Sequence, residues 1–345
     1  KTDFADREFV MSTNALVLTS SDLKIEGKGS VGNSVTITNR GKIEITGNLR
    51  GLNASTSVWT NHEYSYLAIG GNLMVNGILN ASSAGNTIEY NNFGDQDVIL
   101  PSSATYHNLK LRGAGNKTLA GSITVNGNID IYSSAILIGN NFNISISGNW
   151  TNQSSFNPGS GQVTFTGSSN QAITNPMSEE FYNFSLNKSS GELVLENDIV
   201  IENTLTMLAG VINTSQSKLM LGTGTGAGQL GNMSYFGGFV KGKFERWINN
   251  TGSHDFPVGS ANIQRLLINL NGLNSGGTLI AEFTGADPGN SGLPLDDNGT
   301  EIFNTFPEGY WSLEPGNGFN LGASNTYSLR LSGTGFSSFT IDANT

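Results

Sequence analysis

The chain has 345 residues, of which 37% are hydrophobic, 13% are charged and none is cysteine, and its formal net charge is −10. The absence of cysteine excludes disulfides, thiolate metal sites and cysteine nucleophiles. The acidic balance argues against nucleic acid and against an anionic membrane surface as partners. No stretch reaches the roughly 18 apolar residues of a membrane span, so we expect no membrane insertion.

The first ten residues, KTDFADREFV, lack the basic-then-apolar layout of a secretion signal. We therefore expect either that a signal has been removed or that the sequence is an internal piece of a longer protein.

Aromatic residues gather at positions 59–67, where the sequence WTNHEYSYL contains Trp59, Tyr64 and Tyr66. Aromatic faces can stack on sugar rings, and Tyr64 and Tyr66 share one face of an extended segment. The three residues are therefore candidates for ligand binding. The alternative is that they fill the interior of the fold or cover its N-terminal end.

An internal repeat of about 75 residues relates positions 67–143 to positions 144–218. LAIGGN at 67–72 corresponds to ISISGN at 144–149, Gln96 corresponds to Gln171, and TYHNLKL at 105–111 corresponds to EFYNFSL at 180–186. An ordered series of matches over such a distance is the mark of a repeat architecture.

Apolar residues alternate with Ser, Thr and Asn in short runs, which predicts strands with one buried face and no helices. Gly-Asn pairs stand between the runs and predict corners, because both residues tolerate positive φ. Three coils of about 25 residues in each repeat favour a right-handed parallel β-helix over residues 1–240. A left-handed solenoid and a multi-blade propeller are the alternatives.

Asp95 and Asp97 lie two residues apart in FGDQDVIL and would share a face of an extended segment. Paired carboxylates are used in polysaccharide cleavage, so these two residues are candidates for a grafted glycan site. Asn170 and Ala172 occupy the same places in the second copy, and a polar corner is the plainer interpretation. The three histidines, at positions 62, 107 and 254, are too far apart in sequence to indicate a catalytic or metal site.

The repeat pattern of the sequence ends near residue 240. Longer strand candidates follow at 265–272, 277–285 and 326–333, separated by polar loops. They predict an antiparallel β-sandwich-like domain over residues 241–345. Because the given sequence ends in a strand-like run, FTIDANT, we expect this domain to be incomplete.

Asp296, Asp297 and Glu301 in LDDNGTE offer oxygen ligands for calcium, although their spacing does not match an EF-hand. A solvated turn is the alternative. No other cofactor is expected.

The segment ISGNWTNQSSFNPGSGQVTFTGSSNQAIT, together with GFVKGKFERWINNTGSHDFPVG and GYWSL, resembles the large repetitive cell-surface proteins of Bacteroidota. The resemblance covers roughly residues 65–345. It implies export by the type IX secretion system, display on the outer cell surface, and adhesin-like or structural roles that in some relatives serve gliding motility. It carries over no catalytic residue.

We therefore hypothesise a secreted, adhesin-like surface protein whose partners are the type IX secretion machinery and extracellular glycans, surfaces or other surface proteins. One alternative is a carbohydrate-binding or polysaccharide-cleaving β-helix that uses Asp95, Asp97 and the aromatic residues at 59–66. Another alternative is a cargo or accessory subunit of a secretion or motility machine.

Overall fold

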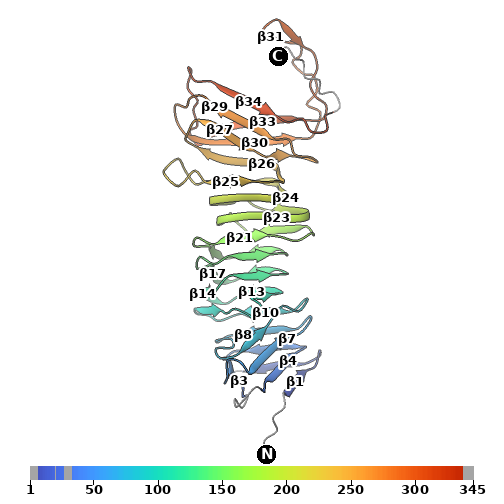
Figure 1. Cartoon of the computed structure of the whole chain (residues 1–345), viewed down its shortest axis with the longest axis vertical. Coiled ribbons are helices and arrows are strands. Elements are labelled where there is room, and N and C mark those ends of the chain that lie inside the picture. The colour runs from blue at the N-terminus through green and yellow to red at the C-terminus, as the bar shows by residue number, and fades with distance from the viewer. Residues whose placement is uncertain (1–6, 20, 27–32, 337–345) are drawn as a thin grey trace, which may run out of the picture. The chain divides into compact units, whose positions relative to one another are not determined.

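The computed structural model describes residues 7–19, 21–26 and 33–336, and every regular element in these ranges is a β-strand. It shows a parallel β-solenoid of about 11 turns followed by antiparallel sheets, which confirms the predicted fold class. The chain divides into two compact units, residues 1–191 and residues 192–345, and each is described by itself. Figure 1 shows the coils of the first unit following one another in chain order.

The strands of the first unit form stacks in which each strand pairs with the strand one coil further along. The first stack runs through β1 (Arg7–Met11), β4 (Val35–Asn39), β7 (Ser57–Asn61), β9 (Ile78–Asn80), β12 (Thr105–Tyr106), β15 (Ile123–Val125), β18 (Ile144–Ile146), β21 (Gln162–Phe165) and residues 183–186 of β23 (Glu179–Leu195). The second stack runs through β2 (Leu16–Thr19), β5 (Lys42–Ile45), β8 (Tyr66–Ile69), β10 (Thr87–Tyr90), β13 (Asn108–Leu111), β16 (Ile129–Ile131), β19 (Trp150–Asn152) and β22 (Gln171–Thr174). The third stack contains β11 (Gln96–Val98), β14 (Ala114–Leu119), β17 (Ser134–Ile138) and β20 (Ser155–Asn157), while β3 (Leu23–Ile25) pairs with β6 (Leu49–Gly51).

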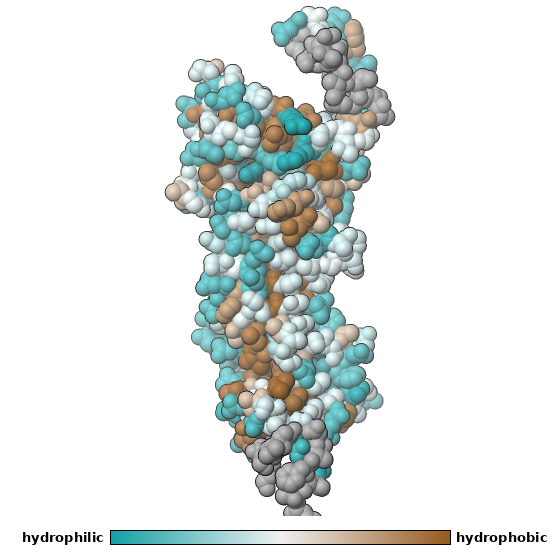
Figure 2. All heavy atoms as spheres, viewed as in Figure 1, coloured by the Kyte–Doolittle hydropathy of each residue, from teal (hydrophilic) through white to brown (hydrophobic). Residues whose placement is uncertain are grey.

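Alternate residues of each strand point inward and stack in register on their partners in the next coil. In the second stack this inward column consists of Ile43, Leu67, Ile88, Leu109, Ile129 and Trp150, each 0% exposed. Full burial of one such side chain is worth about 1.5–3 kcal/mol, so the column is a main source of stability. In the face shown in Figure 2, hydrophilic and near-neutral residues cover most of the surface of both units, with smaller hydrophobic patches between them.

Several Gly-Asn pairs lie at corners where the asparagine links one coil to the next. The Asn48 side-chain oxygen accepts a hydrogen bond from the backbone N–H of Asn72 at 2.8 Å, and Asn128 does the same for Asn149 at 2.9 Å. Along the solenoid such bonds join residues 20 to 26 positions apart, which is the length of one coil.

The predicted reason for glycine holds at some Gly-Asn pairs and not at others. Gly85 and Gly115 have positive φ values of 72° and 74°, whereas the backbone of Gly71 and of Gly148 lies outside the left-handed region. A Cβ atom at Gly148 would lie 2.4 Å from the carbonyl oxygen of Gly127 in the preceding coil. At Gly71 and Gly148, glycine is therefore required by the close approach of stacked corners.

The matched glutamines of the sequence repeat make the same contacts. Gln96 Nε2 donates to the carbonyls of Ile69 and Gly71 at 3.0 and 2.6 Å, and Gln171 Nε2 donates to those of Ile146 and Gly148 at 3.4 and 2.6 Å. Yet Gln96 lies in the third stack and Gln171 in the second. The equivalent local structure therefore recurs on a different face of the solenoid.

The second unit begins with parallel pairing and changes to antiparallel pairing at β26. Parallel partners are β24 (Ile199–Leu221), β25 (Asn232–Tyr235), β26 (Phe239–Ile248) and β28 (Val258–Gly259). One antiparallel sheet contains β26, β30 (Gly277–Thr284) and β33 (Tyr310–Gly316), and the other contains β27 (Gly252–Phe256), β29 (Leu266–Leu270) and β34 (Tyr327–Leu331). A short hairpin is formed by β31 (Leu295–Asp297) and β32 (Thr300–Ile302).

Candidate functional site

The outer face of the second stack carries a connected set of charged and aromatic side chains, which we call the polar wall. Its members are Tyr66, Glu89, Lys110, Arg112, Asp130 and Tyr132. Parallel pairing places Glu89 opposite Lys110, and Lys110 opposite Asp130. Because neighbouring strands lie about 4.7–4.9 Å apart, residues one coil apart in sequence become lateral neighbours.

Glu89 is the centre of the polar wall. Glu89 is only 4% exposed, and its carboxylate accepts a hydrogen bond from the Tyr66 hydroxyl at 2.5 Å. Lys110 Nζ lies 3.6 Å from the same oxygen. A buried carboxylate is tolerated only with such partners. Burial, reinforced by the contact with Glu89, raises the pKa of Tyr66, so this hydroxyl remains a donor.

Two cations meet one aromatic ring at the next rung. Lys110 and Arg112 lie 5.6 and 5.9 Å from the centroid of the Tyr132 ring, within the range of cation–π attraction. Asp130 lies beside them, and burial raises the pKa of its carboxyl. The polar wall therefore orders its charged groups through aromatic as well as ionic contacts.

A hollow of about 240 Å³ opens at the edge of the polar wall. It is lined by Glu89, Asn91, Phe93, Arg112, Gly113 and Ser133. Phe93 is 86% exposed. A carboxylate, an amide, a guanidinium and an exposed ring within one hollow can hydrogen-bond the hydroxyls of a sugar and cover its apolar face.

The three aromatic residues that were candidates for ligand binding lie in different environments. Trp59 is fully buried in the first stack, and its ring nitrogen donates to Asn61 Oδ1 at 3.0 Å, so it can offer no face to a ligand. Tyr64 lies in a turn with a positive φ of 58° and is 82% exposed. Tyr66 belongs to the polar wall.

The predicted carboxylates are not brought together with these aromatic residues. Asp97 is exposed on β11 in the third stack, whereas Tyr66 lies in the second. Asp95 is also exposed, and its carboxylate accepts the backbone N–H of Asn116 at 2.8 Å, as a corner residue does. Neither aspartate lines the hollow beside Phe93.

Lys117 is a basic residue that interacts electrostatically with Asp95, and its ammonium group is occupied. It is 0% exposed and donates to the carbonyls of Asn92, Gly94 and Ala114 at 2.8, 2.8 and 2.9 Å. Burial lowers the pKa of Lys117 to about 8. Its contacts give it a structural role within the coil.

The proposed calcium ligands lie on the β31–β32 hairpin, where Asp296 pairs with Glu301 in register. Asp296 accepts the backbone N–H of Gly299 at 2.6 Å and so serves the turn. The side chain of Asp297 lies outside the described residues. Within the described ranges, no group of three or more His, Asp or Glu side chains is placed to hold a metal ion.

The histidines are separate in the structure as in the sequence. His62 contacts Arg40 at 3.5 Å, His254 is buried against the carbonyl of Asn250 at 3.0 Å, and His107 lies beside Gly127 at a corner.

Sequence reasoning missed Phe93, Lys110 and Arg112. The charged residues of the polar wall could have been found from a repeat spacing of one coil, because Glu89, Lys110 and Asp130 are register partners. A comparison over 75 residues passes over three coils at once and cannot detect it.

No protein-family model, curated protein or solved structure matches this chain. In the part of the chain that the structure describes, no helix is long and apolar enough to cross a membrane.

Proposed function

We propose that this chain is a secreted, adhesin-like protein of the outer cell surface that attaches to extracellular glycans through the polar wall. The observation that carries the proposal is the hollow lined by Glu89, Asn91, Phe93 and Arg112, which lies where strands β10 and β13 of the second stack end. The sequence resemblance to repetitive surface proteins of Bacteroidota supports the location and export by the type IX secretion system. A role in surface spreading is part of the same proposal.

The chemistry of the hollow suits weak, repeated contact with a saccharide. Arg112 and Asn91 supply donors, Glu89 supplies an acceptor, and the exposed ring of Phe93 offers a stacking surface. A hollow of about 240 Å³ is smaller than the roughly 300–1,000 Å³ of drug-sized pockets, so each contact is expected to be weak. Display of many copies on a cell surface would raise the avidity without any new contact.

Replacement of Phe93 by alanine tests the proposal, because it removes the ring and leaves the core of the coil unchanged. The matched control is Met177→Ala, which removes an exposed apolar side chain (80% exposed) elsewhere in the first unit. We expect Phe93→Ala to lower attachment of cells that display the protein to glycan-coated surfaces at least fivefold, and Met177→Ala to leave attachment unchanged.

Binding of the purified variants to a glycan array is the companion measurement. Equal attachment and equal array binding by Phe93→Ala and wild type would overturn the proposal. So would an equal loss in both variants, because that result would point to a general effect of surface hydrophobicity.

A further inference from the structure

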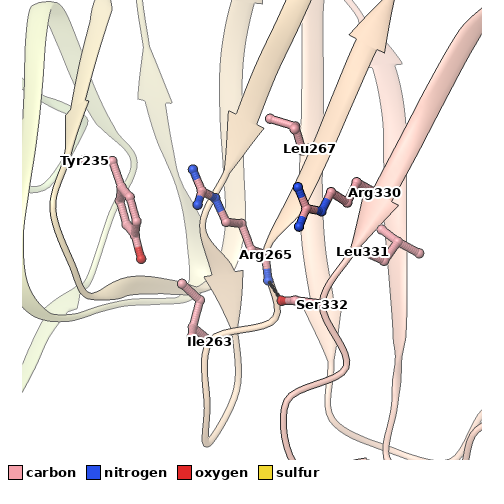
Figure 3. Close-up of a pocket in the computed structure, with 7 residues that line it drawn as sticks. All are labelled: Tyr235, Ile263, Arg265, Leu267, Arg330, Leu331 and Ser332. Atoms are coloured by element: carbon pink, nitrogen blue, oxygen red, sulfur yellow. Dashed lines mark hydrogen bonds between the residues drawn. The ribbon is translucent and has the colours of Figure 1, made fainter. Parts of the chain in front are cut away.

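A second hollow lies within the unit formed by residues 192–345, and it combines two arginines with apolar walls. Its volume is about 440 Å³. Figure 3 shows its lining residues: Tyr235, Ile263, Arg265, Leu267, Arg330, Leu331 and Ser332. The volume falls within the range of ligand-binding pockets.

Antiparallel pairing of β29 and β34 places the two arginines on one face. Arg330 is opposite Leu267, and Ser332 hydrogen-bonds Arg265 twice, from its backbone N–H at 3.0 Å and through its hydroxyl at 2.7 Å. Arg265 and Arg330 are thus diagonal neighbours, a separation that long side chains can bridge. In Figure 3 the guanidinium of Arg330 extends toward Arg265, which in turn extends toward Tyr235.

The charges around the hollow do not balance. Asp255 on β27 binds Arg265 with both carboxylate oxygens, at 2.7 and 2.5 Å, and holds its guanidinium 5.0 Å from the centroid of the Tyr235 ring. The guanidinium of Arg330 has no ion-pair or hydrogen-bond partner among the described residues. Half-buried Arg246 adds a further positive charge nearby, where it donates to the backbone carbonyl of Asp255 at 2.7 Å. A chain of net charge −10 therefore holds a local excess of positive charge here.

We propose that this hollow binds an acidic saccharide unit, with the sugar carboxylate on Arg330 and the ring against the apolar wall. The planar fork of an arginine matches a carboxylate with two parallel hydrogen bonds. Ile263 and Leu267 offer apolar surface for the C–H face of a pyranose, and the Ser332 hydroxyl is a further hydrogen-bonding group of the lining. Asp255 keeps Arg265 fixed, so the anion is directed to Arg330. The site does not depend on the polar wall, which lies in the other unit.

The test is titration of the full chain with a tri- or tetragalacturonate, followed by calorimetry. The methyl-esterified oligosaccharide of equal length serves as the uncharged probe, and a sulfated neutral oligosaccharide serves as the alternative anion. We expect the galacturonate to bind. Arg330→Gln should weaken the affinity for the galacturonate at least tenfold, and Arg330→Lys should weaken it less. The matched control is Lys243→Gln, which removes one exposed positive charge of the same unit outside the hollow.

Four results would overturn the proposal: no binding of the galacturonate at millimolar concentration, equal binding of the methyl ester, equal or tighter binding of the sulfated probe, or equal weakening by Arg330→Gln and Lys243→Gln. The last would show a general charge effect. Phe93→Ala should leave galacturonate binding to the hollow unchanged, so a failure of this site and a failure of the polar wall are distinguishable.

Discussion

Glu179 places a carboxylate in the interior of the first unit, where it is 2% exposed and contacts two amide side chains. Asn152 Nδ2 donates to it at 3.0 Å and Asn175 Nδ2 at 2.7 Å. Burial raises the pKa of Glu179 to about 7 and outweighs these hydrogen bonds, which act in the opposite direction. The neutral, protonated acid is therefore the form that the fold favours.

This pKa makes stability depend on pH with a definite sign. Between the ordinary glutamate value of about 4.5 and the folded value of about 7, the folded state holds a proton that the unfolded state releases. The free energy of unfolding should thus fall as pH rises through this range, by about 3 kcal/mol from this group at 1.36 kcal/mol per pKa unit. Glu179→Gln should remove that part of the decline when chemical denaturation is measured at pH 5 and pH 8.

Glu180→Gln is the matched control, because the neighbouring glutamate is exposed and is the smallest contributor to the raised pKa of Glu179, so its loss should leave most of the decline intact. A wild-type protein that is as stable at pH 8 as at pH 5, or a Glu179→Gln variant with an undiminished decline, would contradict this account.

Single residues also mark where sequence reasoning stopped. Lys117 and Lys188 read as surface residues in any alternating pattern, yet both are almost completely buried, with Lys188 donating to the Ser169 carbonyl and to Gln171 at 2.8 and 2.6 Å. Their burial follows from carbonyl groups that converge only after the coils stack. Arg265 and Arg330 were likewise invisible as a pair, because 65 residues of chain separate two positions that antiparallel pairing makes neighbours.

At the scale of elements, the alternation of apolar and polar residues was sufficient to predict strands and their buried faces. The Gly-Asn pairs between the strand-like runs were sufficient to predict corners. The repeat could not reveal that its second copy lies on a different face, since the hydrogen bonds of Gln96 and Gln171 are the same in either position. The separation of Tyr66 and Asp97 into two stacks could not be predicted for the same reason, because the assignment of a strand to a stack is a property of the folded coil.

Corner packing gives a prediction for one element. Gly148→Ala would place a Cβ atom 2.4 Å from the backbone of Gly127, and neither corner can retreat without lengthening the coil-to-coil hydrogen bond of Asn149. We expect a loss of about 1–3 kcal/mol in the free energy of unfolding, as for other overpacked sites.

Gly94→Ala is the matched control, because the nearest atom to its added Cβ would be 3.9 Å away. Its effect should stay within about 0.5 kcal/mol. Equal effects of the two substitutions, measured by urea denaturation, would show that close corner approach does not select glycine.

At the scale of the whole molecule, a chain with 13% charged residues and 45 glycines builds its order from stacked backbone and repeated amide bonds. Each coil of the first unit contacts mainly the coils before and after it, so stability is the sum of coil and nearest-neighbour terms. The polar wall and its hollow inherit the rigidity of the central coils. This arrangement would suit the proposed surface attachment, in which the groups of the polar wall must hold their spacing under load.

Nearest-neighbour stability predicts a gradient of amide hydrogen exchange along the first unit. The described residues of β1 and β2 pair with β4 and β5 on one side, and Phe9, Leu16 and Leu18 in these strands are 59%, 63% and 65% exposed. Strands β13, β16 and β19 pair on both sides around fully buried residues. In the 345-residue chain, amides of the central strands should exchange at least a hundredfold more slowly than those of β1 and β2 when followed by mass spectrometry.

Gly148→Ala should accelerate exchange most in the coils next to β18 and β19 and least in β4 and β7. Uniform protection from β1 to β19, or uniform acceleration by the substitution, would mean that the unit opens as a single block, and the additive account of its stability would be wrong.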